Sequence, residues 1–161
     1  SVEIDNTDAE GRLALADALC YVSEKSPEVL IDMATLTGAI VVALGGCCSG
    51  VFTSSNQLWQ LLESAGLKSN ELMWRMPLIT DYFSKLIKVN VANLKNNSGR
   101  EAGSCTAATF LSEFVDLSKV GHWAHIDIAG VALGYHGQST MTGRPTRAII
   151  QLAKDIAVKK Q

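Results

Sequence analysis

The sequence predicts an α/β fold in which a mixed sheet carries helices on both faces. Two observations predict it. Apolar segments of strand length occupy residues 28–36 and 123–132, and proline or glycine bounds each of them. Segments with helical spacing of apolar residues lie before, between and after these strands. Strands that alternate with helices form sheets that are covered on both faces.

The amino-terminal elements follow from apolar spacing and from residues that begin or end structure. Leu13, Ala16 and Leu19 form the apolar stripe of a helix over 7–22. The strand at 28–36 leads into a short helix at 39–44, which Gly45-Gly46 ends. A short strand is predicted at 51–53. Asn56 is the predicted N-cap of the next helix, which Gly66 is expected to end.

The carboxy-terminal elements are a helix at 81–88, a weak strand at 89–94 and a polar loop at 95–103. Ser104 is predicted to cap a strong helix that runs to Val115. The second long strand, 123–132, follows. A loop at 137–146 and a final helix at 147–158 complete the chain.

Composition narrows the class of protein. The chain has 161 residues, of which 47% are hydrophobic and 19% charged, a balance typical of one folded α/β domain. The formal net charge is −2 and no Lys/Arg cluster forms a basic face, so no nucleic-acid partner is expected. The longest uncharged run, 33–62, has too short an apolar part to cross a bilayer, so no membrane association is expected.

The chain begins at Ser1 without a charged-then-apolar leader, so no signal peptide is expected. Polar, functional-looking residues close to this start suggest a segment of a longer protein. The four cysteines contain no C-x-x-C pair. Reduced, mostly buried thiols in the cytoplasm are therefore preferred over a disulfide framework.

The first constellation that can carry chemistry comprises Asp8, Glu10 and Arg12. Two carboxylates at an element boundary can bind a divalent cation, and a neighbouring arginine can hold an anion. A structural alternative is at least as strong on local grounds, since Thr7-x-x-Glu10 is also a helix capping box. Two carboxylates are too few for a metal site, so further ligands would have to come from elsewhere.

The segment Ala34-Thr35-Leu36-Thr37-Gly38 is the second candidate, because it follows an apolar strand. Ligands of open α/β sheets gather at the carboxyl ends of strands, and glycine leaves backbone groups accessible. The alternative is a plain strand-to-helix turn.

Other reactive residues give weaker signals. His122 and His125 lie three apart on a strand and point to opposite faces, which disfavours a shared metal. His125 and Asp127 share a face and can pair, whereas His136 is expected in solvent. The adjacent pairs Cys47-Cys48 and Ser104-Cys105 have no histidine nearby in sequence, so neither predicts a nucleophile. A nucleotide-binding module is disfavoured because Gly99–Gly103 lacks a Gly-Lys-Ser/Thr ending.

The octapeptide Asn6-Thr-Asp-Ala-Glu-Gly-Arg-Leu13 matches the signature of the leucyl (cytosol) aminopeptidase family. Further segments resemble that family in the same order: 34–38, 102–108, 123–130 and 142–147. The resemblance extends over residues 1–161 and identifies them as a carboxy-terminal portion of the catalytic domain. For Asp8 and Glu10, the resemblance also favours a role as metal ligands over a role in helix capping.

The resemblance implies a metal-dependent aminopeptidase that releases apolar, leucine-like residues from the amino terminus of peptides. It implies two divalent ions, zinc foremost, with manganese, magnesium or cobalt possible at one site. Glu10 would bridge both ions and Asp8 would bind one. Arg12 would hold a bicarbonate-like anion that acts as general base. The substrate pocket would be lined by Thr35, Leu36, Gly38 and Ala129, in a cytoplasmic homohexamer.

Two departures from the family pattern matter. The remaining ligands, which include lysines and aspartates, belong to a segment upstream of Ser1 in the family, so this chain alone is expected to be inactive. The strands around Leu30 and Ile126 are expected to expose faces meant for that segment. Ala132 stands where the family often has methionine, which affects the predicted side-chain preference. The alternative function is a catalytically silent homologue with an assembly role, which the retained Asp8, Glu10 and Arg12 disfavour.

Overall fold

The computed structural model describes residues 1–134 and 140–159. A four-stranded sheet lies at its centre, in the order β2 (Val29–Ala34), β6 (His122–Asp127), β3 (Ser49–Phe52) and β4 (Met73–Arg75). The pairs β2/β6 and β3/β4 are parallel, whereas β3/β6 is antiparallel. The sheet is therefore mixed, as the sequence predicted.

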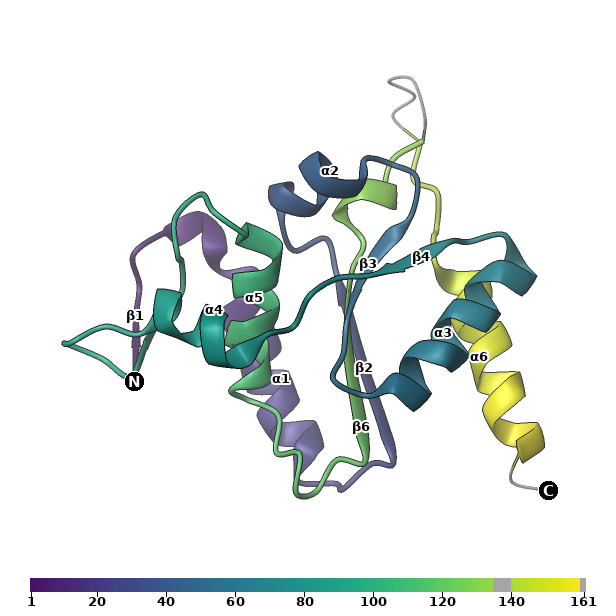
Figure 1. Ribbon diagram of the computed structural model, residues 1–161, viewed down its shortest axis with the longest axis horizontal. Coiled ribbons are helices and arrows are strands. Elements are labelled where there is room, and N and C mark those ends of the chain that lie inside the picture. The colour runs from purple at the N-terminus through teal and green to yellow at the C-terminus, as the bar shows by residue number, and fades with distance from the viewer. Residues whose placement is uncertain (135–139, 160–161) are drawn as a thin grey trace.

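Helices cover both faces of this sheet, which confirms the predicted fold class (Figure 1). On one face α3 (Asn56–Ser69) and α6 (Thr146–Lys159) pack over Val51, Ala124 and Ile126. On the other face lie α1 (Gly11–Ser23), α4 (Thr80–Ile87) and α5 (Gly103–Ser112). The alternation of side chains along β6 divides the core between the two faces, since Trp123 belongs to the α1/α5 side and Ala124 to the α3/α6 side.

The expectation that the two long strands expose apolar faces is wrong for β6 and holds in part for β2, where no residue is fully buried and Met33 is 42% exposed. Ile126 has no exposed surface and Leu30 is half-buried against the core around Trp123. The helices of the chain itself supply the cover, because α6 and α3 close one face and α1 and α5 the other.

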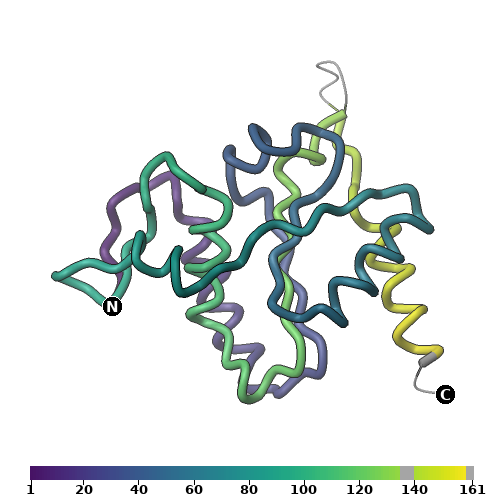
Figure 2. The backbone as a smooth tube through the Cα atoms, viewed as in Figure 1, coloured from purple at the N-terminus to yellow at the C-terminus, as the bar shows by residue number. Residues whose placement is uncertain are grey.

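A second, two-stranded sheet joins the start of the chain to its middle. β1 (Val2–Glu3) pairs in parallel with β5 (Leu94–Lys95), and Figure 2 shows these distant segments side by side. Asn96, which is fully buried, extends the connection. Its Oδ1 accepts hydrogen bonds from the N–H groups of Asp5 and Asn6 at 3.0 and 3.2 Å, and its Nδ2 donates to the Asn6 carbonyl at 2.7 Å. The signature motif is thereby fixed to the residues that follow β5.

The capping box predicted at the first helix is absent. Asn6, not Thr7, is the N-cap of a short 3₁₀ helix, η1 (Thr7–Ala9), and its side chain accepts from the Asp8 N–H at 2.9 Å. Glu10 precedes α1 with a helical backbone and makes no capping hydrogen bond through its side chain. The alternative that Glu10 serves in a helix capping box is therefore wrong.

Three other element ends differ from prediction. Ser55, not Asn56, caps α3, because its hydroxyl accepts from the Leu58 N–H at 3.1 Å. The helix continues through Gly66 and ends at Ser69, and its C-cap residue Asn70 adopts the left-handed conformation. Ala102 precedes α5 in the same conformation, so Ser104 lies inside the helix and caps nothing.

The predicted strands are also revised. Of 89–94 only Leu94 is in a strand, and β4 was not predicted. The strand predicted at 123–132 ends at Asp127, and a second 3₁₀ helix, η2 (Ala129–Val131), follows. This early end places Asp127 and Ala129 at the carboxyl edge of the sheet, beside the end of β2.

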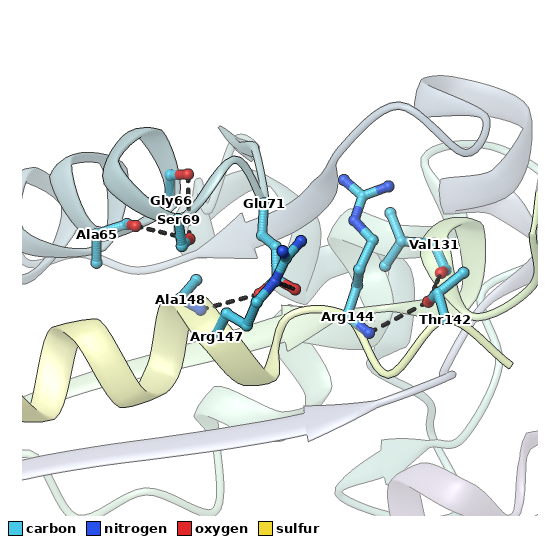
Figure 3. Close-up of polar contacts among 9 residues, drawn as sticks. All are labelled: Ala65, Gly66, Ser69, Glu71, Val131, Thr142, Arg144, Arg147 and Ala148. Atoms are coloured by element: carbon cyan, nitrogen blue, oxygen red, sulfur yellow. Dashed lines mark hydrogen bonds and ion pairs between the residues drawn. The ribbon is translucent and has the colours of Figure 1, made fainter.

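The last helix is fixed at its start by a buried carboxylate, as Figure 3 shows. Glu71, only 3% exposed, accepts from the Ala148 N–H and from Nε of Arg147, both at 2.9 Å. Nearby, the Thr142 hydroxyl donates to the Val131 carbonyl. His136 lies outside the described residues.

None of the helices that the structure describes is long and apolar enough to span a membrane. The four thiols are free, but only Cys48 and Cys105 are buried, so the expectation of mostly buried thiols holds for half of them. Burial raises the pKa of both buried thiols.

The short helix α2 (Gly38–Leu44) packs closely on η2, and Gly130 makes the approach possible. A Cβ at Gly130 would lie 2.2 Å from the Gly45 carbonyl oxygen, a contact that only backbone movement relieves. We expect Gly130→Ala to destabilise the fold by about 1–3 kcal/mol. The measurement is the thermal unfolding midpoint of the full-length protein.

The matched control is Gly38→Ala, where an added Cβ meets nothing within 4 Å. A Gly130→Ala protein as stable as this control would contradict the close packing of α2 on η2.

Candidate active site

A pocket of about 410 Å³ opens where α1 begins, β2 ends and η2 starts. Its lining includes every residue that the sequence singled out for a site: Asp8, Glu10, Arg12, Thr35, Leu36, Gly38 and Ala129. The fold thus brings the signature motif, the end of β2 and the turn after β6 to one place. Their individual roles stay predictions.

Asp8 and Glu10 present their carboxylates to solvent at this pocket. Asp8 belongs to η1 and Glu10 is the residue between η1 and α1. Within the described residues, neither side chain makes a hydrogen bond or ion pair. Both carboxylates therefore remain available to a ligand from outside.

This pair cannot complete a metal site by itself. Among residues 1–134 and 140–159, no three His, Cys, Asp or Glu side chains are placed to hold one ion. A catalytic zinc site normally has three protein ligands and an open position. Asp8 and Glu10 have the oxygen donors that a divalent cation accepts, but a site there would need further ligands.

Arg12 is the buried cation of the site, with 8% exposure. Its Nη1 donates to the Asn96 carbonyl at 2.7 Å, whereas its Nε is buried without a partner among the described residues. Burial lowers the pKa of Arg12, and the charge of Asp127 acts in the opposite direction. A buried donor without an acceptor is costly, so the free Nε fits an anion bound beside Arg12.

A second pocket, of about 140 Å³, lies against the same arginine. Asp8, Leu36 and Gly38 line both pockets, and the second also contacts Asn97 and Thr106. Arg12 therefore borders two adjoining pockets, and the smaller one extends toward α5.

The predicted pocket residues differ in how much they expose. Thr35 and Gly38 are exposed, whereas Leu36 and Ala129 are half-buried. The N–H groups of Leu36 and Ala129 both donate to Asp127, at 3.1 and 3.2 Å, and are unavailable to a ligand. Leu36 and Ala129 can therefore offer a ligand their carbonyls and apolar side chains. Ala132, expected to influence the pocket, does not line it.

Asp127 is a functional candidate whose partners the sequence did not identify. Pairing with His125 was possible because the two share a face, but the Asp127 carboxylate binds the turn after β2. His125 instead forms a 2.5 Å hydrogen bond with Asp32, whose other oxygen accepts from the Trp123 indole at 2.8 Å. Because β2 and β6 are parallel with Asp32 opposite His125, the true partner comes from the neighbouring strand.

His122 and His125 make separate contacts. His122 bonds the Ser55 hydroxyl at 2.9 Å, and His125 stacks on Phe52. They share no ligand among the described residues.

Residues 1–150 match the model of the cytosol aminopeptidase family, catalytic domain. The chain belongs to this family. A cytosol aminopeptidase of Xenopus tropicalis is 45% identical over all of this chain and 32% of its own length. A probable cytosol aminopeptidase of Chloroherpeton thalassium is 51% identical over 96% of this chain and 31% of its own length.

The comparison with solved structures supports the same family. A mutant of tomato leucine aminopeptidase superposes with a TM-score of 0.88 at 41% identity, over 94% of this chain and 29% of that one. The chain therefore spans about a third of the length of the family members it matches.

Proposed function

We propose that residues 1–161 form the carboxy-terminal portion of the catalytic domain of a two-metal aminopeptidase. The enzyme would release apolar, leucine-like residues from the amino terminus of peptides. One observation carries the proposal: a single pocket gathers the signature carboxylates, the buried arginine, the end of β2 and the turn after β6. Membership of the cytosol aminopeptidase family supports it.

Asp8 and Glu10 would hold the metal ions, with Glu10 shared between them and zinc the foremost choice. Manganese, magnesium or cobalt would be possible at one position. Bound ions of this kind activate water and polarise a carbonyl. Both carboxylates lie at the pocket without protein partners among the described residues, so both are free to bind ions. The remaining ligands would come from outside this chain, since three suitable side chains do not meet within its described part.

Arg12 would hold a bicarbonate-like anion as a proton acceptor beside the carboxylates. Its burial makes its charge effective, because a low-dielectric surrounding screens it less than water does. Its Nη1 is held by the Asn96 carbonyl, which orients the guanidinium and leaves Nε for the anion.

Thr35, Leu36, Gly38 and Ala129 would receive the substrate. Leu36 and Ala129 face the pocket from two different strand ends and would contact the apolar side chain of the terminal residue. The exposed Thr35 and Gly38 would contact the peptide backbone.

The cellular setting is part of the same proposal. We expect a homohexamer. We expect it in the cytoplasm, in line with the name of the cytosol aminopeptidases to which the chain is similar. Light scattering of the full-length protein measures this directly, and a stable monomer would contradict it.

The test of function is hydrolysis of a leucyl peptide by the full-length protein containing these residues. We expect turnover that a chelator abolishes and added zinc or manganese restores. The same peptide with an acetylated amino terminus is the control substrate and should not be cleaved. A metal-loaded hexamer that cleaves neither peptide would support the alternative, a silent homologue with an assembly role.

Replacement of Arg12 separates the anion role from metal binding. We expect Arg12→Ala to lower kcat by about a hundredfold to a thousandfold, the usual effect of removing one preorganised electrostatic group. Metal content should stay near that of the wild type, because Arg12 is not a ligand. The measurements are steady-state kinetics and metal analysis of the full-length protein.

Lys154→Ala is the matched control, since it removes an exposed cation on α6. An Arg12→Ala protein that matches this control in kcat would contradict the catalytic role of the guanidinium.

A further inference from the structure

Asp127 is a buried carboxylate with no role in the proposed chemistry. It ends β6, is 1% exposed, and lies between Ala34 of β2 and Gly50 of β3 in the sheet register. A buried carboxylate is costly unless its oxygens are hydrogen-bonded. The partners it has acquired therefore indicate what the fold uses it for.

Those partners come from both walls of the candidate pocket. One oxygen, Oδ1, accepts from the Leu36 N–H at 3.1 Å and from the Ala129 N–H at 3.2 Å. The other, Oδ2, accepts from the Thr37 hydroxyl at 2.7 Å. Leu36 and Thr37 follow β2, whereas Ala129 begins η2. A single side chain thus joins the two segments that carry the predicted substrate contacts.

Thr37 transmits the same constraint to Gly38. Its hydroxyl donates to Asp127 and accepts from the Ile40 N–H at 3.1 Å, which caps α2. The proton and one lone pair of the hydroxyl are both engaged. The start of α2, with Gly38, is therefore fixed relative to the carboxylate.

We infer that Asp127 is a positioning residue of the site. Through Oδ1 it holds the Leu36 and Ala129 walls of the pocket at a fixed separation, and through Oδ2 and Thr37 it fixes the start of α2. This inference rests on the proposed aminopeptidase function. It also predicts that the two contacts separate by substitution, because Oδ1 holds the pocket walls and Oδ2 holds the start of α2.

Asp127→Asn keeps an oxygen for the two N–H donors and removes the negative charge. Asp127→Ala removes both. Thr37→Val removes only the bond to Oδ2 and the cap of α2. Asp81→Asn is the matched control, since it removes one negative charge from an exposed position on α4.

The experiment uses these four variants of the full-length protein and two readouts. The first is the exchange rate of the Leu36 and Ala129 amides with deuterium. We expect Asp127→Ala to speed exchange about tenfold or more, because the acceptor is lost, whereas Asp127→Asn and Asp81→Asn stay near the wild type. Thr37→Val should affect Ile40 and leave Ala129 protected.

The second readout is the steady-state kinetics of leucyl-peptide hydrolysis. Asp127→Ala should raise KM about tenfold or more. Asp127→Asn should leave KM within about threefold of the wild type, because its remaining oxygen still accepts from both N–H groups. Asp81→Asn should leave KM unchanged.

The outcomes distinguish this inference from the function on which it rests. Amide exchange as slow as in the wild type, or an unchanged KM, in Asp127→Ala would overturn it. If Asp127→Ala fails to fold, the other two variants decide the inference. Loss of amide protection at Leu36 and Ala129 in Asp127→Asn, or at Ala129 in Thr37→Val, would overturn it. The expected exchange pattern in a wild-type protein without leucyl hydrolysis would overturn the proposed function and leave the positioning of the pocket walls standing.

Discussion

Glu10→Ala in the full-length protein should abolish nearly all leucyl-peptide hydrolysis and reduce the bound metal. The proposed role of Glu10 is to share its carboxylate between two ions, so that its loss disturbs both positions at once. No carboxylate among the described residues can replace it, since only Asp8 lies beside it in the pocket lining. Kinetics and metal analysis of the purified variant measure the two effects.

The controls separate ligand loss from damage to the fold. Glu24→Ala removes an exposed carboxylate just beyond the end of α1 and should leave metal and activity unchanged. Because Glu10 has no capping role, its replacement should not unfold α1. Unchanged metal stoichiometry in Glu10→Ala would count decisively against the bridging role.

The second large effect concerns residues 1–161 expressed alone. We expect no measurable aminopeptidase activity and poor retention of divalent metal, because two carboxylates are fewer than the ligands of a catalytic site. The assay is leucyl-peptide hydrolysis with added zinc, manganese or cobalt, next to the full-length protein as positive control.

Circular dichroism of the same sample checks that the helices have formed. A folded chain without activity agrees with an incomplete site. Chelator-sensitive turnover near that of the full-length protein would show that the ligands outside this chain are dispensable, which contradicts the assignment.

The fold class was predictable because it depends on long segments with clear periodicity. The strands at 29–34 and 122–127 and the helices around them are long enough for their apolar pattern to stand out. β1, β4 and β5 have only two or three residues each, too few for a period to be read. Their pairing is decided by tertiary contacts, such as those of the buried Asn96.

Helix ends were less predictable because several polar residues compete for one cap. Asn6 and Thr7 both suit the position before the first helix, as do Ser55 and Asn56 before α3. In each case the earlier residue is the cap. The first outcome matters for function, since a cap at Asn6 leaves the Glu10 carboxylate free.

The candidate site was predictable where it is continuous in sequence. Asp8, Glu10 and Arg12 lie within five residues, and Thr35–Gly38 follows a recognisable strand. The role of Asp127 was not predictable, because it depends on the register of β6 against β2, which places Asp127 opposite Ala34. The alternation of side chains along a strand correctly predicted that His125 and Asp127 share a face. It could not show that His125 pairs with Asp32 and that Asp127 pairs with Thr37.

The central claim is that Asp8 and Glu10 are metal ligands whose site is completed from outside this chain. A crystal structure of the full-length protein with zinc, located by anomalous scattering, tests it most directly. We predict two ions in the pocket between α1 and the end of β2, with carboxylate oxygens of Asp8 and Glu10 at about 2.0–2.2 Å and the other ligands from upstream residues. Zinc bound elsewhere, with Asp8 and Glu10 bare, would contradict the claim.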